Sequence, residues 1–88
     1  MDKKEQIIKR YFNSWITGEV SVLSETFAEN AVYVESYGPL YRGLEAVIKW
    51  FEHWNEHGSV LEWEIFQFIH NKETVICECF FNCVYDKK

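Results

Sequence analysis

The sequence predicts an α+β fold that forms a single domain over residues 1–88. Apolar residues recur at helical spacing in three segments, and two long segments near the C-terminus have the aromatic and β-branched composition of strands. A shorter strand pair lies between the second and third helical segments. The resulting order α-α-β-β-α-β-β, with long antiparallel strands late in the chain, favours separate helical and sheet layers over βαβ units.

The first helix is predicted over residues 3–17. Asp2, followed by Glu5 three residues later, fits a capping box at its start, and Gly18 suits the left-handed position after its last turn. The apolar side chains of this segment form one stripe, made of Ile7, Ile8, Tyr11, Phe12, Trp15 and Ile16. We therefore expect this helix to bury one largely aromatic face.

Two further helices are predicted from the same spacing. The second covers residues 20–28 and places its apolar side chains inward, namely Val20, Leu23 and Phe27. The third covers residues 44–57, begins after Gly43 and ends at Gly58. Its buried side is expected to carry Leu44, Val47, Ile48, Phe51 and Trp54.

Four strands are predicted as two hairpins. The first hairpin joins a strand over residues 31–37 to a short return strand over residues 40–42 through the turn "GP". The second joins residues 59–70 to residues 74–85 through the tight turn "NKE". Both hairpins are therefore expected to be antiparallel.

The first strand of the first hairpin carries an acid among aromatic residues. Alternation along "AVYVESYG" places Tyr33, Glu35 and Tyr37 on one face. Val32, Val34 and Ser36 lie on the other face. Two interpretations follow: a solvated face with amphipathic tyrosines, or a carboxylate at the wall of an apolar pocket.

Composition and charge exclude several classes of function. The net charge of −5 and the lack of a Lys/Arg cluster argue against a nucleic-acid partner. No apolar run approaches the roughly 20 residues of a membrane span, and the first residues lack the apolar core of a signal peptide. We expect a cytoplasmic protein. The chain is 48% hydrophobic, so part of this apolar surface is expected to face a ligand or another subunit.

The sequence predicts neither a metal site nor a cofactor. Cys77, Cys79 and Cys83 share one face of a strand, which suits reduced thiols and lacks the fourth ligand of a zinc site. His53 and His57 are four residues apart on the third helix, but no HExxH pattern accompanies them. Histidines at a helix C-terminus also suit the helix dipole.

The order of these segments resembles the nuclear transport factor 2-like superfamily, including its SnoaL-like and ketosteroid isomerase-like branches. The resemblance rests on an aromatic helix that ends in "GE", the entry "FAENAV" to the first strand, "YRG" before the third helix, and the strand "VLEWEIFQFIH". It implies a cone in which three helices pack on the concave face of a strongly bent mixed sheet. Relatives continue into two further strands, which this chain is expected to lack.

The resemblance also implies a mostly apolar pocket and two reactive residues. The tyrosine that polarises the substrate in the ketosteroid isomerase-like branch falls on Tyr11, and the base falls on Glu35, which replaces an aspartate. The polar residues that could lie close to Glu35 are Tyr11, Tyr33, Tyr37 and His70. The side chains expected to bind substrate are Trp15, Tyr33, Tyr37, Phe51, Trp54 and Trp63.

Two functions therefore stay open from the sequence. One is an enzyme of the isomerase, dehydratase or cyclase type that acts on an apolar small molecule. The other is a non-catalytic ligand-binding or association domain. Without two further strands, the last strand would offer an unpaired edge to another chain, which predicts a homodimer or higher homo-oligomer.

Overall fold

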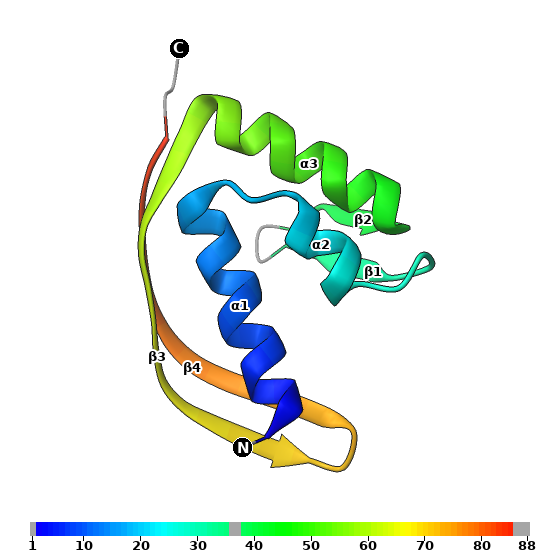
Figure 1. The fold of residues 1–88 in the computed structure, drawn as a ribbon, viewed down its shortest axis with the longest axis vertical. Helices are drawn as coiled ribbons and strands as arrows, with labels where there is room; N and C mark the ends of the chain where they lie inside the picture. Colours follow the sequence, from blue (N-terminus) through cyan, green and yellow to red (C-terminus); the bar gives the residue numbers. More distant parts are fainter. Residues whose placement is uncertain (1, 36–37, 86–88) are drawn as a thin grey trace.

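The computed structural model describes residues 2–35 and 38–85 and has the predicted α+β fold. Three helices and four strands follow one another in the predicted order (Figure 1). They are α1 (Lys3–Thr17), α2 (Ser21–Thr26), β1 (Val32–Val34), β2 (Leu40–Arg42), α3 (Leu44–His57), β3 (Gly58–Asn71) and β4 (Thr74–Tyr85). The second helix and the first strand are shorter than expected, whereas α1 and α3 have the predicted bounds.

Helix α1 begins and ends as its sequence predicts. The Asp2 carboxylate accepts a hydrogen bond from the Glu5 backbone N–H at 3.1 Å, which satisfies one free donor of the first turn. Gly18 has a φ of 81° and donates its N–H to the Ser14 carbonyl at 2.7 Å. This left-handed conformation is one that glycine adopts without a steric penalty, so the helix ends there.

The strands form two antiparallel hairpins, β1–β2 and β3–β4. Within the described ranges no strand links them, so the single mixed sheet implied by the resemblance is replaced by two separate two-stranded sheets. In β1–β2, Tyr33 lies opposite Tyr41. In β3–β4 the register shifts at two places in β3, after Val60 and after Ile65, and such bulges bend a strand. Figure 1 shows this long hairpin curving around α1.

The core lies where α1 meets α2, α3 and β3. Its fully buried apolar side chains are Tyr11, Trp15, Leu23, Val47, Phe51 and Val60. They come from all three helices and from the first part of β3, so one cluster joins the helical layer to the long hairpin. None of the helices in the described part of the chain is long and apolar enough to cross a membrane.

Helix α3 passes into β3 without a loop, at Gly58. This residue ends the helix, as predicted, but it has an extended φ of −152° and is also the first residue of β3. A Cβ at this position would lie 2.7 Å from the Tyr85 ring and 2.8 Å from the Val84 carbonyl oxygen. The absence of a side chain therefore lets the end of β4 approach the start of β3.

Leu23 and Leu40 provide a matched test of this core. Leu23 is completely buried, so Leu23→Ala should lower the free energy of unfolding by about 2–5 kcal/mol, through lost burial and a residual cavity. Leu40 is 45% exposed, and Leu40→Ala should change it by no more than about 0.5 kcal/mol. Urea denaturation followed by circular dichroism measures both. Equal losses for the two variants would contradict the assigned core.

Candidate functional site

The inward face of the first hairpin carries Tyr33 and Glu35. Both are half-buried. By contrast, Val32, which precedes Tyr33, is 52% exposed, and Val34, which lies between Tyr33 and Glu35, is 63% exposed. Alternation along the strand thus turns the acid and the tyrosine towards the helices and leaves the valines outside. Tyr37 was predicted on the same face and lies outside the described residues.

Tyr11 on α1 and Tyr33 on β1 meet through their hydroxyl groups. The Tyr11 hydroxyl donates a hydrogen bond to the Tyr33 hydroxyl oxygen at 3.0 Å. Tyr11 is only 6% exposed, because aromatic rings surround it at centroid distances of 5.1 to 6.5 Å. These rings belong to Phe12, Trp15, Phe27, Tyr33 and Trp63. The pair is therefore a polar contact inside an apolar environment.

The electrostatics of this contact keep both phenols protonated. Burial raises the pKa of Tyr11 far above its ordinary value, and the neighbouring Tyr33 raises it further. Burial also raises the pKa of Tyr33, which the hydrogen bond from Tyr11 partly offsets. The Glu35 carboxylate adds to the rise in pKa of both phenols, so its charge is felt at the pair. Both phenols therefore keep their protons and act as hydrogen-bond donors at neutral pH.

The indole of Trp15 adds a donor that the sequence did not indicate. Trp15 is 4% exposed, and its Nε1–H has no hydrogen-bond partner among the described residues. The neighbouring indole lowers the pKa of the Tyr11 phenol, against the larger effect of burial. An unpaired buried donor is costly, so a ligand or water acceptor here would be favourable.

The other predicted binding residues have different positions. Phe51 is 1% exposed and packs on Trp15 with ring centroids 4.5 Å apart, so both are part of the core. Trp54 is half-buried and lies edge-on to Trp15. Trp63 is half-buried and stacks on Phe12 at 3.8 Å with an interplanar angle of 6°.

A shallow groove of about 290 Å³ lies on the flank of α1, beside β3. Of the predicted binding residues that the structure describes, Trp63 alone lines it; the others in its wall are Lys9, Phe12, Asn13, Ile16 and Ile65. Because α1 turns Tyr11 inward and this flank outward, the groove is separate from the Tyr11–Tyr33 contact.

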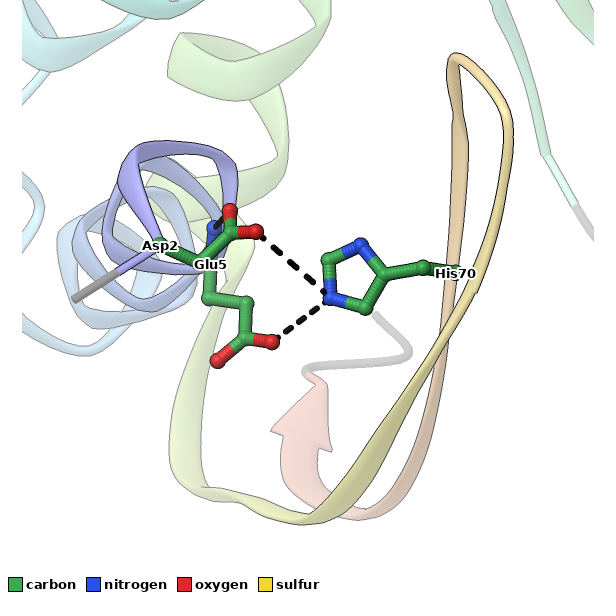
Figure 2. A group of neighbouring side chains, drawn as sticks. All are labelled: Asp2, Glu5 and His70. Atoms are coloured by element: carbon green, nitrogen blue, oxygen red, sulfur yellow. Dashed lines mark hydrogen bonds and ion pairs between the residues drawn. The ribbon is translucent and has the colours of Figure 1, made fainter.

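His70 does not meet Glu35 but joins the start of α1. Figure 2 shows its ring, from β3, pointing towards Asp2 and Glu5. Its Nε2 lies 2.6 Å from the Glu5 carboxylate and 3.8 Å from the Asp2 carboxylate. The three groups have ligand atoms within 4.8 Å of one another, but they are accessible and already pair among themselves. We interpret them as a tether between the far end of the long hairpin and α1.

The class of protein that these features define is a small α+β domain with an aromatic interior, in which a tyrosine pair lies beside a carboxylate. A family model described as a SnoaL-like domain matches residues 8–86 of the 88. The chain therefore belongs to the SnoaL-like family, within the nuclear transport factor 2-like superfamily. Its fold is of the isomerase-like, small-molecule-binding kind. A comparison with curated proteins found no match.

Asp2→Asn tests the contribution of the helix cap through pH. The Glu5 amide hydrogen bond lowers the pKa of Asp2 below its ordinary value of 3.8. The cap's stabilisation is therefore complete above that value and is lost as the pH falls through the lower folded-state pKa. Asparagine keeps a capping oxygen but does not titrate.

We expect the wild type to melt at a higher temperature than Asp2→Asn at neutral pH and the difference to shrink as the pH approaches about 3. Circular dichroism melts at several pH values measure it. A difference that stays constant with pH would contradict a charged cap.

Proposed function

We propose that this chain binds a largely apolar small molecule with a carbonyl group and shifts a proton on it, as an isomerase does. The observation that carries this proposal is the buried hydrogen bond between Tyr11 and Tyr33, beside the half-buried Glu35. Membership of the SnoaL-like family supports a small-molecule ligand. The Tyr11–Tyr33 pair binds the carbonyl oxygen, and the apolar side chains around the pair bind the apolar part of the molecule.

The tyrosine pair is suited to stabilise an enolate oxygen. A donor whose pKa is raised keeps its proton while negative charge develops on the substrate, so it stabilises that charge without losing its own proton. Tyr33 donates to no side chain among the described residues, which leaves its O–H for the ligand. The hydrogen bond from Tyr11 orients the Tyr33 hydroxyl, and the Tyr11 O–H dipole adds to the stabilisation of the enolate oxygen.

In this proposal Glu35 acts as the base. Its backbone N–H donates to the Pro39 carbonyl at 2.8 Å and its carbonyl accepts from the Gly38 N–H at 3.0 Å, so the turn fixes the start of the side chain. The carboxylate removes the proton between the carbonyl and a β,γ double bond, and the electrons move onto the oxygen. Return of that proton to the γ-carbon gives the conjugated ketone and restores the carboxylate.

A β,γ-unsaturated cyclohexenone is a suitable probe, because its conjugated product absorbs in the ultraviolet. The wild type should accelerate this conversion, and Glu35→Gln should abolish the acceleration, since the shape is kept and the basic oxygen is lost. Glu35→Asp should retain part of it. Equal rates for wild type and Glu35→Gln, both folded by circular dichroism, would exclude Glu35 as the base.

The tyrosine donors are tested separately by binding of para-nitrophenolate, which resembles an enolate in charge and shape. Tyr33→Phe should weaken binding about 10- to 100-fold, the cost of one hydrogen bond to a charged group. Tyr41→Phe is the matched control, because Tyr41 lies opposite Tyr33 in the same hairpin and its ring stacks on Trp50 of α3. Binding that depends on Tyr33, together with no turnover of the ketone, would favour the non-catalytic alternative.

We also propose that the chain forms a homodimer, which is the specific form of the association alternative. The outer face of β3–β4, defined here by Ile69, Ile76, Phe80 and Val84, is 46% to 58% exposed. Exposed apolar side chains of this size, on a hairpin whose edges are open in the described residues, are typical of an association surface. A two-fold arrangement covers this face on both copies at once.

Phe80→Glu should shift the molecule from dimer to monomer, because a carboxylate at the centre of this face would be desolvated in the dimer. Val34→Glu is the control, since Val34 is 63% exposed in the other hairpin. Sedimentation velocity at micromolar protein concentration measures both. A wild type that remains monomeric there would exclude the dimer.

A further inference from the structure

The inner face of β4 carries three thiol groups that the proposed reaction does not use. Cys77, Cys79 and Cys83 are all free, at alternating positions of one strand. In the register of the hairpin Cys77 lies opposite Phe68, Cys79 opposite Ile65 and Cys83 opposite Val60. Cys83 is thus beside the buried core. Cys77 and Cys79 lie farther from the core, nearer to the start of β4.

Cys79 is the accessible member of this neighbouring pair. Its side chain is exposed, and its Sγ accepts a hydrogen bond from the Trp63 indole N–H at 3.2 Å. Trp63 in turn is held by its stack on Phe12, so the indole gives Cys79 a fixed partner. Such an N–H donor favours a sulfur atom that carries negative charge, as a metal-bound thiolate does.

Cys77 and Cys79 are two residues apart in β4, so their side chains lie on the same face of the strand. Burial raises the pKa of the Cys77 thiol, and the neighbouring Cys79 thiol adds to this rise. The Lys9 ammonium lies 6.0 Å from the centre of the Phe68 ring, which is directly across the hairpin from Cys77. The Lys9 ammonium is thus over the ring of the residue that pairs with Cys77.

We propose that Cys77 and Cys79 bind one soft, two-coordinate metal ion, with copper(I) as the natural class of ligand. Soft thiolates prefer such ions, and linear coordination needs only two sulfur ligands. Two S–H bonds break, two S–Cu bonds form and two protons are released, with no change in oxidation state. Zinc needs four ligands in a tetrahedron, and Cys83 is separated from Cys79 by Phe81, so this strand does not build a zinc site.

Silver(I) alone is the probe, because it shares the linear thiolate chemistry of copper(I) and is not oxidised in air. The wild type should bind one silver ion tightly, and Cys77→Ser and Cys79→Ser should each weaken this binding by more than about tenfold, since a direct ligand matters at least as much as its outer partners. Cys83→Ser is the matched control on the same face and should bind like the wild type. Native mass spectrometry gives the stoichiometry, and competition with a chelator gives the affinity.

The indole of Trp63 provides an independent readout. Silver bound at Cys79 should quench its fluorescence, whereas Trp63→Phe should still bind one ion and lose that part of the quenching. Circular dichroism establishes that each variant is folded, and Cys79→Ala repeats the test with a different side chain. Equal weakening by all three serine variants, or unchanged binding by Cys77→Ser or Cys79→Ser, would overturn the paired site.

Discussion

The packing of one aromatic turn of α1 into the bend of β3–β4 is the interaction on which the rest of the structure depends. Tyr11 contacts Phe27 after α2 and Tyr33 in β1, while Trp15 contacts Phe51 in α3. Rings of this size bury about 150–250 Å² each, which is worth about 4–6 kcal/mol before the entropy of ordering is counted. Two side chains therefore join every layer of the fold.

This arrangement makes the core and the candidate site share residues. The ring of Tyr11 stabilises the fold, while its hydroxyl, brought into the interior with it, forms the polar contact with Tyr33. The indole N–H of Trp15 enters the same region without a partner among the described residues. Because burial removes these groups from water, it raises the pKa of both phenols and strengthens the influence of Glu35 on them. The burial that stabilises the fold is therefore also the cause of the raised pKa of the two phenols.

Local pattern predicted most of the fold and the inward placement of Tyr33 and Glu35 in the candidate site. Helical periodicity gave the bounds of α1 and α3, and alternation placed Tyr33 and Glu35 inward, because both depend on near neighbours in the chain. It did not predict that the hairpins form separate sheets, which depends on how far apart they lie. It missed the Trp15 donor and the pairing of His70 with Glu5, which are 65 residues apart. Such contacts follow from the curvature of β3–β4, which local sequence patterns do not predict.

An isolated two-stranded hairpin is at best marginally stable, so the long β3–β4 hairpin depends on what holds its ends. At one end, α3 continues directly into β3, and Val60 enters the core. At the other end, His70 pairs with Glu5, and Lys4 pairs with Glu73 at 3.1 Å. Surface pairs of this kind are individually weak, but together they close the bend around α1. Ile69, Ile76 and Phe80, which are 46% to 54% exposed, lie between these two anchors. The same anchoring that holds the hairpin around the aromatic interior thus leaves the outward side chains between the anchors exposed.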